Sequence, residues 1–339
     1  MKALVFTDTR QVQIQDSPDP IAGANQAVIK VIGTGICGSD LTGFLGHSPR
    51  RRPPLILGHE VIGTAVHVPP GEWPFQIGDR VVANPLQACG MCDRCRAGQT
   101  NICAKWSLIG MDRTPGAFAE YVTVAARNVY PLTSGVPDAQ AVMIEPLANG
   151  VHLFNLIRQH SFGCLAIYGA GTQGILMLAL ARQLGYREIA IVDTNSARLG
   201  IGERMGAVKL LNPRECDPAK AIVEWTNGAG VDVGIDAVGT TPVRQSLVNA
   251  VRKGGEIMLL GLHDVMSDVD FALVVRNEIR LQGSFAYTAA DFETSKKLLE
   301  DGSISIEPWT VSRPLEDGQA AFDRLVGDPG DTLKIILTP

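Results

Sequence analysis

The sequence predicts an α/β protein built from two different parts. Residues 1 to about 147 contain short β-like runs broken by Gly and Pro, such as residues 27–32 and 80–83, a spacing that suits a strongly bent antiparallel sheet or barrel. After Glu145-Pro146, apolar strands begin to alternate with longer helical segments. Such alternation is typical of a parallel, doubly wound sheet with helices on both faces.

The second part should open with a helix over residues 147–159. Its expected strands are residues 165–168, 189–192, 231–236, 256–260 and 279–282. From about Tyr287 the chain is expected to turn helical again, over residues 290–300, and then to end in a strand at residues 333–337.

Length and composition fit a globular enzyme of two domains. A chain of 339 residues with 45% hydrophobic and 19% charged residues is too long for one ordinary core and too apolar for a disordered chain. A net charge of −5 gives no basic stripe for nucleic acid, and no apolar run approaches the roughly 20 residues that span a bilayer. Seven cysteines without an export signal favour metal or redox chemistry over disulfides, and with it a cytoplasmic location.

A glycine-rich loop after the expected strand at residues 165–168 predicts a dinucleotide site. Gly169-Ala170-Gly171-Thr172-Gln173-Gly174 matches G-x-G-x-x-G and opens a helix, and Asp193 follows nineteen positions after Gly174. The glycines permit a tight turn, close approach of the pyrophosphate and close helix–strand packing. Asp193 should accept hydrogen bonds from a ribose 2′-hydroxyl, which favours NAD over NADP, whereas Arg198 would help a 2′-phosphate.

Four cysteines within fifteen residues predict a closed metal site. Cys89, Cys92, Cys95 and Cys103 form a Cys-x2-Cys-x2-Cys-x7-Cys pattern, and four thiolates complete a tetrahedral zinc shell with no open position. An iron–sulfur cluster also uses four thiolates, so the spacing alone leaves the metal undecided.

Cys37 and the neighbouring pair His59-Glu60 suggest a second, open metal site. One thiolate, one imidazole and one carboxylate would leave a position free for water or substrate. Each residue alone is explained equally well by core packing, but their occurrence together, upstream of the cysteine loop and the dinucleotide motif, favours a catalytic metal.

These residues resemble the zinc-containing medium-chain dehydrogenase/reductase family, the alcohol dehydrogenase superfamily, over the whole chain. Within it the sequence is most similar to the branch of polyol, sorbitol, galactitol-phosphate and threonine dehydrogenases. Besides the cysteine loop, the motifs that carry the resemblance are Gly58-His59-Glu60-Val61-Ile62-Gly63, Gly78-Asp79-Arg80-Val81, Gly116-Ala117-Phe118-Ala119-Glu120-Tyr121 and Glu145-Pro146-Leu147-Ala148.

The resemblance implies a GroES-like catalytic domain over residues 1–147, to which residues 287–339 return. It implies a Rossmann NAD-binding domain over residues 148–286, with the active cleft at the junction. Relatives are dimers or tetramers, so we expect a homo-oligomer, with a tetramer favoured over a dimer.

The resemblance also implies two zinc ions per chain, one structural in the cysteine loop and one catalytic. Cys37, His59 and a glutamate should bind the catalytic zinc, with Glu60 and Glu145 as the candidate glutamates. We expect Glu145 to be the exchangeable ligand and Glu60 to give nearer support, because Glu60 is tied to its neighbour His59. Asp40 should fix the ring of His59.

The implied reaction is hydride transfer between NAD(H) and a secondary alcohol or ketone of a small polar substrate, such as a polyol, sugar alcohol or sugar acid. Zinc would polarise the substrate oxygen, and Ser39 is placed to take the hydroxyl proton. Two positions depart from the family pattern. Thr42 stands where a proton-relay histidine is common, and Ala286 stands where sorbitol dehydrogenases are expected to have an arginine.

Other substrates remain open at this stage. A simple alcohol, a threonine-like amino alcohol and a phosphorylated polyol are alternatives, and the run Arg50 to Arg52 is the one hint of a substrate anion, although a solvated loop explains it more simply. Phe44, Trp106 and Phe118 are candidates for the pocket wall, and core packing is an equally good interpretation of each. A catalytically silent nucleotide-binding relative is a remote alternative, which the intact ligand set opposes.

Overall fold

The computed structural model describes residues 1–339 except residues 134, 159–162 and 306–308. It divides into two units, one formed by Met1–Glu145 with Tyr287–Pro339 and the other by Pro146–Ala286. These divisions lie close to the predicted ones at residues 147 and 287. The end of the helix predicted over residues 147–159 lies outside the described residues; the observed helix α4 is Ile144–Leu156.

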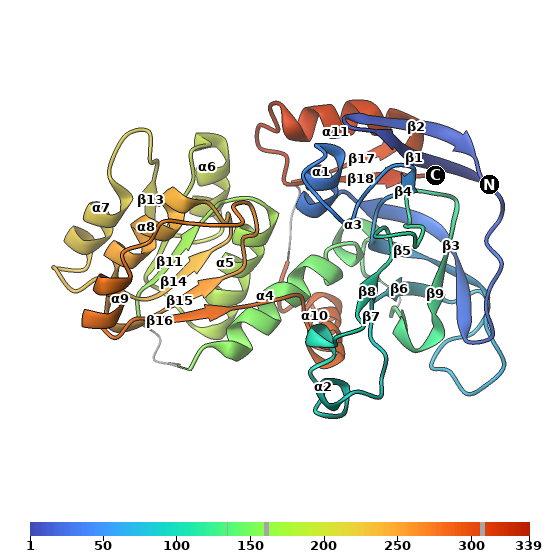
Figure 1. The fold of residues 1–339 in the computed structure, drawn as a ribbon, viewed down its shortest axis with the longest axis horizontal. Coiled ribbons are helices and arrows are strands. Elements are labelled where there is room, and N and C mark those ends of the chain that lie inside the picture. The colour runs from blue at the N-terminus through green and yellow to red at the C-terminus, as the bar shows by residue number, and fades with distance from the viewer. Residues whose placement is uncertain (134, 159–162, 306–308) are drawn as a thin grey trace. The chain divides into compact units, whose positions relative to one another are not determined.

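The first unit is built around a seven-stranded sheet (Figure 1). Its strands are β3 (Gln26–Gly35), β5 (Glu60–His67), β6 (Arg80–Ala83), β9 (Tyr121–Ala125), β10 (Val129–Pro131), β17 (Thr310–Pro314) and β18 (Lys334–Thr338). The order is β10–β6–β5–β3–β18–β17, with β9 also paired to β3, and only the β17–β18 pair is parallel. Strand β3 is central, and its last residue, Gly35, pairs with Glu60 on one side and Ile336 on the other.

Smaller elements complete the first unit. Strands β1 (Lys2–Asp8), β2 (Gln11–Asp16) and β4 (Leu55–Ile56) form a second sheet, and β7 (Leu86–Gln87) pairs with β8 (Ser107–Leu108) at the base of the cysteine loop. The helices are α1 (Gly38–Phe44), α2 (Asp93–Arg96), α3 (Asp138–Ala141), α10 (Ala289–Glu300) and α11 (Gly318–Val326), with short 3-10 turns η1 (Thr100–Ile102), η2 (Ala126–Asn128) and η3 (Leu315–Asp317). Helix α4 carries the chain into the second unit.

The second unit is a six-stranded parallel sheet with helices between its strands. The strands are β11 (Leu165–Tyr168), β12 (Ile189–Val192), β13 (Lys209–Leu211), β14 (Val231–Asp236), β15 (Val251–Leu259) and β16 (Arg280–Gly283). The helices are α5 (Thr172–Leu184), α6 (Ser196–Arg204), α7 (Pro218–Trp225), α8 (Thr241–Ala250) and α9 (Phe271–Arg276). In the strand order β13–β12–β11–β14–β15–β16, the chain first adds strands on one side of β11 and then, from β14, on its other side. In such sheets the ligand binds at the carboxyl ends of the strands, at the point where the chain changes sides.

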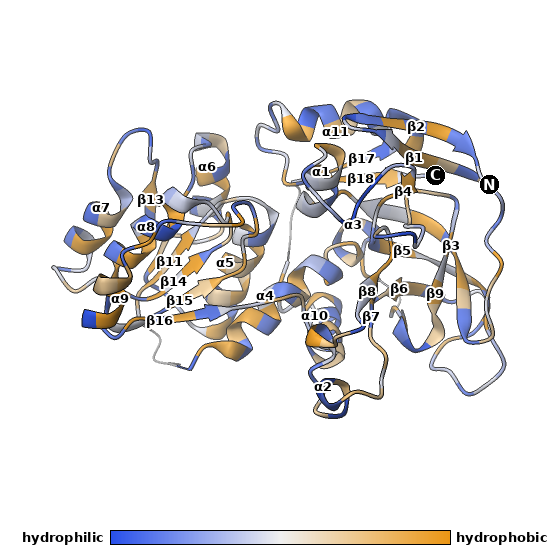
Figure 2. Ribbon diagram, in the orientation of Figure 1, coloured by the Kyte–Doolittle hydropathy of each residue, from blue (hydrophilic) through white to orange (hydrophobic). Residues whose placement is uncertain are grey.

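Burial explains why these strands read as continuous apolar runs. Every residue of β11 and β12 is buried, as expected for a parallel sheet covered on both faces, and β11 has the colour of hydrophobic residues in Figure 2. The predicted fold class, which combines a β-rich unit with a doubly wound parallel-sheet unit, is confirmed. No helix of the described residues combines the length and apolar character that a membrane crossing requires.

Candidate metal and cofactor sites

The predicted open metal site is formed where β3 ends and β5 begins. Cys37 precedes α1, and His59 and Glu60 stand at the start of β5, beside the end of β3 because Gly35 pairs with Glu60. The donor atoms of these three residues all lie within 4.8 Å of one another. His59 and Glu60 are buried, and Cys37 is half-buried. The chain therefore brings thiolate, imidazole and carboxylate to one point.

Asp40 touches two of these residues, of which only His59 was a predicted partner. One of its oxygens, Oδ2, accepts a hydrogen bond from the backbone N–H of Cys37 at 3.0 Å, while Oδ1 lies 3.4 Å from Nδ1 of His59. Burial opposes ionisation of Asp40, but the charges of His59 and Arg51 outweigh it and leave the pKa of Asp40 below its usual value. Because Nδ1 of His59 faces Asp40, Nε2 is the ring nitrogen left to bind a metal.

The local electrostatics favour a cation at this point. Burial lowers the pKa of His59, but the negative charges of Asp40 and Cys37 more than offset it and raise this pKa well above the usual value. Surroundings that hold a proton on a buried imidazole will also hold a metal ion in its place.

Glu60 has a buried partner that sequence reasoning missed. Nζ of Lys334, in β18, lies 2.7 Å from both carboxylate oxygens of Glu60 and donates a hydrogen bond to Oε1 and, at 3.0 Å, another to the backbone oxygen of Ile36. Burial lowers the pKa of Lys334, yet Glu60 and Cys37 raise it above the usual value, so the lysine stays charged. The one available signal was a lysine inside the apolar run Leu333–Leu337.

The second oxygen of Glu60, Oε2, is buried and accepts no hydrogen bond, although Nζ of Lys334 lies 2.7 Å away as an ionic partner. It passes directly over Gly35, where an added Cβ would lie 2.1 Å from it. A buried carboxylate oxygen that accepts no hydrogen bond keeps lone pairs that a metal ion can satisfy. Gly35 therefore makes room for the carboxylate that faces Cys37 and His59.

Glu145 is held by Tyr287, another residue that the sequence did not single out. The Tyr287 hydroxyl donates a 2.5 Å hydrogen bond to Oε1 of Glu145, and both side chains are buried. Burial, with the nearby charges of His59 and Glu60 acting in opposite directions, raises the pKa of Glu145 to about 7. The predicted ranking made Glu145 the exchangeable ligand and Glu60 the support, but the structure groups Glu60, rather than Glu145, with Cys37 and His59.

Ser39 and Thr42 lie on α1 beside this cluster. Ser39 is half-buried in the first turn of the helix. Thr42 is exposed, and its hydroxyl donates a 3.1 Å hydrogen bond back to the carbonyl oxygen of Gly38. The hydroxyl proton of Thr42 is thus donated within its own helix.

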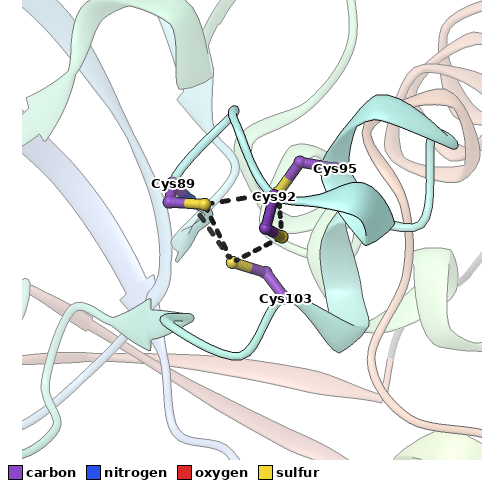
Figure 3. A group of neighbouring side chains, drawn as sticks. All are labelled: Cys89, Cys92, Cys95 and Cys103. Carbon is purple, nitrogen blue, oxygen red and sulfur yellow. Dashed lines mark hydrogen bonds between the residues drawn. The ribbon is translucent and has the colours of Figure 1, made fainter.

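The four cysteines of the predicted closed site converge (Figure 3). Sulfur–sulfur distances are 3.5 Å for Cys92–Cys95 and Cys89–Cys103, 3.8 Å for Cys92–Cys103 and 3.9 Å for Cys89–Cys95. A tetrahedron of Zn–S bonds places its sulfurs roughly 3.8 Å apart. The spacing therefore fits one tetrahedral ion better than a cluster of several irons, whose thiolates bind different metal atoms.

Backbone donors prepare this loop for negative charge. The N–H groups of Met91 and Cys92 lower the pKa of Cys89 to about 6. Burial and the neighbouring sulfurs raise the pKa of Cys95 to about 12. Without a cation the four sulfurs cannot all be thiolates, so the arrangement suits a bound metal ion.

The predicted dinucleotide loop joins β11 to α5. Gly169 has φ +103°, which permits the tight turn, and a Cβ on Gly174 would lie 1.7 Å from the Gly169 carbonyl oxygen, so only glycine fits there. Gly171 caps α5, and Thr172 and Gln173 form the first turn, whose N–H groups suit a phosphate.

Asp193 follows β12 beside that loop. Its Oδ2 accepts a hydrogen bond from Ala170 N at 2.6 Å, and its Oδ1 accepts one from Asn195 N at 2.8 Å. A cavity of about 1050 Å³ opens here, lined by Gly169, Asp193 and residues of α7 and α8. Arg198, in α6, also reaches the loop, since its Nη1 would lie 3.8 Å from a Cβ on Gly171. The predicted cofactor residues are therefore gathered at the carboxyl edge of the sheet.

The run Arg50 to Arg52 is not an open cationic patch. Arg50 donates two hydrogen bonds to Asp112, at 3.2 and 2.7 Å, and stacks 3.9 Å above the ring of Trp106. Arg51 is buried, and the exposed Arg52 donates to the Pro49 carbonyl oxygen. Because Arg51 is buried, it neither meets a substrate anion on the surface nor belongs to a solvated loop, so both interpretations of the run are wrong at this residue.

Two of the three predicted pocket aromatics belong to the core. Phe44 and Phe118 are fully buried and pack on Phe322, with ring centroids 4.9 and 5.9 Å away. Trp106 lies beneath Arg50. Core packing was the correct interpretation of Phe44 and Phe118.

Comparisons with known proteins define the class. Residues 23–134 match the family described as alcohol dehydrogenase GroES-like domain, and residues 174–301 match the zinc-binding dehydrogenase family. The chain is therefore an oxidoreductase of the zinc-dependent alcohol dehydrogenase type. It belongs to the zinc-containing medium-chain dehydrogenase/reductase family, as its motifs predicted.

Individual relatives span a range of substrates and cofactors. The chain is 31% identical to a sorbitol dehydrogenase of Bacillus subtilis, over 100% of this chain and 97% of that protein. It is 33% identical to a 2-dehydro-3-deoxy-L-galactonate 5-dehydrogenase of Pseudoalteromonas atlantica, over 87% of this chain and 86% of that protein. Among solved structures, a zinc-binding dehydrogenase of Sinorhizobium meliloti bound to NADP has 26% identity and a TM-score of 0.90, covering 100% of this chain and 99% of that one. An alcohol dehydrogenase of Escherichia coli complexed with NADH has 25% identity and a TM-score of 0.92, with the same coverage.

Proposed function

We propose that this chain transfers a hydride between NAD(H) and a secondary alcohol carbon of a small polyhydroxylated substrate, using one catalytic and one structural zinc. The observation that carries the proposal is the buried cluster of Cys37, His59 and Glu60, whose donor atoms lie within 4.8 Å of one another. A thiolate, an imidazole and one carboxylate are the ligands of an open, catalytic zinc site, and the four-thiolate loop is the matching closed one.

The protein's own groups have distinct tasks in this reaction. Bound zinc supplies Lewis-acid polarisation of the substrate oxygen, and the hydride step is the chemistry of the nicotinamide ring. Cys37 and His59 hold the metal, and Asp40 fixes the ring of His59. Ser39, two residues after Cys37, accepts the hydroxyl proton of the substrate. With Thr42 bonded back into its helix, the proton then leaves through water rather than through a side chain at that position.

We assign the third donor to Glu60 and revise the ranking that the sequence suggested. Lys334 donates a hydrogen bond to Oε1 of Glu60, while Oε2 is buried, accepts no hydrogen bond and has the lysine only as an ionic neighbour. Tyr287 holds Glu145, which supports the site by hydrogen bonding. Two anionic glutamates on one ion would reduce its pull on the substrate oxygen, so unequal roles suit catalysis.

Asp193 supports NAD as the preferred cofactor. Its carboxylate is fixed by two backbone N–H groups at the rim of the cavity, where a 2′-phosphate would meet a like charge. Relatives bind either nucleotide, so the preference rests on this residue and on how far Arg198 counteracts it.

A polyol or sugar acid is the favoured substrate class. The two curated relatives act on substrates of this kind, but Ala286, at the place of the expected arginine, offers no donor to a hexitol hydroxyl. A simple alcohol or a threonine-like amino alcohol is the next candidate. A phosphorylated polyol loses its sequence-based support, because Arg50 is paired with Asp112 and Arg51 is buried.

The test is turnover of a substrate panel. The zinc-loaded enzyme is incubated with NAD and with polyols, sugar acids, amino alcohols and simple alcohols, and NADH absorbance is followed. We expect a polyol or a sugar acid to give the highest kcat/KM. Turnover of simple alcohols alone would reject the substrate class, and no turnover of any alcohol by a protein that holds two zinc ions would reject the function.

Two further proposals accompany this function. We propose a homo-oligomer, a tetramer before a dimer, which light scattering on the purified chain would decide. The thiolate-rich loop also supports a reducing compartment, which for this chain we take to be the cytoplasm.

A further inference from the structure

Arg51 is the only buried arginine in the part of the chain that the structure describes. Its side chain is 5% exposed, and Nε lies 3.6 Å from Oδ1 of Asp40. Nε and Nη2 are buried and make no hydrogen bond. An arginine stays charged in a protein, so a permanent positive charge stands behind the proposed metal site. Nothing in the reaction proposed above uses it.

The fold makes a specific place for this side chain. Gly43 lies in α1, one helical turn after Asp40 and therefore on the same face. A Cβ at Gly43 would come within 2.9 Å of both Cβ and Cδ of Arg51. The Ser48 hydroxyl accepts a 3.2 Å hydrogen bond from the backbone N–H of Arg51, which fixes the approach to the helix. The stem of Arg51 thus lies against α1 where a glycine leaves space, and its charge reaches Asp40.

Asp40 links Arg51 to two residues of the metal cluster, His59 and Cys37. Its Oδ1 lies between Nε of Arg51, at 3.6 Å, and Nδ1 of His59, at 3.4 Å. Its Oδ2 holds the backbone of Cys37. A carboxylate with one cationic neighbour would turn fully toward His59, whereas one with two such neighbours is drawn between them. Carboxylate partners of this kind set both the orientation and the donor strength of a ligating histidine.

We propose that Arg51 is a positioning residue that acts through Asp40 to set the orientation and donor strength of His59 at the catalytic metal. The inference rests on the proposed zinc site, but it concerns metal binding and needs no knowledge of the substrate. Arg51 touches neither metal nor substrate. Its effect should therefore appear in metal retention and ligand geometry as well as in turnover.

The experiment compares Arg51→Met, Arg51→Lys and Gly43→Ala with Arg52→Met. Arg52→Met removes the same charge one residue away, from an exposed side chain bonded only to a backbone oxygen, and is the matched control. Zinc release to a chelator, the visible spectrum of the cobalt-substituted protein, kcat and KM are measured, with thermal unfolding as a check of folding.

We expect Arg51→Met to release the catalytic metal about 10- to 100-fold faster and to lower kcat by about 10-fold, because losses of this size follow removal of outer partners of a ligating histidine. The cobalt spectrum should shift, Arg51→Lys should recover part of each effect, and Arg52→Met should match the wild type. Gly43→Ala, which keeps the charge but displaces it, should resemble Arg51→Met.

An Arg51→Met protein with an unchanged cobalt spectrum and unchanged zinc release, but a lower melting temperature, would overturn the inference in favour of mere packing. If Arg51→Met does not fold, unchanged spectra in Arg51→Lys and Gly43→Ala would overturn it equally. Failure of the proposed function is separate: a wild type that turns over no alcohol, while Arg51→Met still releases metal faster, would reject the dehydrogenase reaction and leave the role of Arg51 standing.

Discussion

The cysteine loop and the buried cluster are the two proposed metal sites of the first unit, but they are assembled over very different lengths of chain. The loop takes its four sulfurs from residues 89–103 and is only half-buried at Cys89, Cys92 and Cys95. The cluster joins Cys37 to His59 and Glu60, and Lys334, Tyr287 and Arg51 surround it. A closed site can be built locally because four like ligands suffice. An open site needs outer groups that orient its three unlike donors.

The largest contrast should appear on replacing one cysteine of each site. Cys37→Ser should leave a folded protein whose kcat/KM falls by about 1000-fold, since zinc contributes several kcal/mol to such a transition state. Cys95→Ser should instead destabilise the fold by about 4 kcal/mol or more, a size typical of losing a structural metal. Activity assays, denaturant unfolding and elemental analysis check both variants.

Two outcomes would break this comparison. One is a Cys95→Ser protein as stable as the wild type. The other is elemental analysis of the wild type that finds one metal per chain or iron in the cysteine loop.

The next contrast separates the two glutamates. Glu60→Gln removes a direct donor and should speed zinc release by more than the roughly 10- to 100-fold expected on loss of an outer partner of a ligand. It should also destabilise the metal-free protein by about 3 kcal/mol, because Lys334 would be left as a buried charge with no ionic partner. Glu145→Gln keeps a hydrogen-bond acceptor for Tyr287 and should lose no more than about 10-fold in turnover. A larger loss of zinc from Glu145→Gln than from Glu60→Gln would restore the ranking predicted from the sequence.

The metal-free protein should show the electrostatic cost of the buried cluster as a pH dependence. Burial raises the pKa of Glu145 from 4.5 to about 7, so the folded state binds this proton more tightly than the unfolded state does. Its contribution to stability is therefore full below the unfolded pKa of 4.5 and is lost as the pH rises through about 7. The loss amounts to about 3 kcal/mol. Denaturant unfolding of the zinc-free protein across this range measures it, and Glu145→Gln, as the control, should lack this component.

The smallest expected effect lies in the second unit. Asp193→Ser removes the charge that opposes a 2′-phosphate and should raise the NADP to NAD ratio of kcat/KM by about 10-fold, equivalent to about 1.4 kcal/mol. Steady-state kinetics with both nucleotides check it. A wild type that already prefers NADP would mean that Arg198 dominates over Asp193.

The same contrast explains what sequence reasoning could reach. The cysteine loop and the Gly169–Gly174 turn depend on spacing within a few residues, and the structure brings together the residues that the sequence singled out at each. The roles of Lys334 and Tyr287 were not predicted, because their partners, Glu60 and Glu145, stand 274 and 142 positions away in the sequence. The burial of Arg51 was not predicted, because a run of three arginines is usually solvated. The space left by the missing Cβ of Gly43 lets the middle arginine turn inward. The roles of Glu60 and Glu145 could not be ranked either, because no pattern in the sequence tells which carboxylate a lysine or a tyrosine will hold.

The pairing of Glu60 with Lys334 also has a consequence for how the protein is made. Ribosomes add about 5 to 20 residues per second, so the 274 positions between the two residues take about 15 to 55 s to synthesise. For most of that time Glu60 has no lysine to hold it, while the cysteine loop, complete at Cys103, already has all four of its sulfurs. A nascent chain could therefore bind the proposed structural metal early, whereas the proposed catalytic cluster gains the ionic partner of Glu60 only when strand β18 emerges. A chain that stops before Lys334 would contain the whole cysteine loop but would lack this partner.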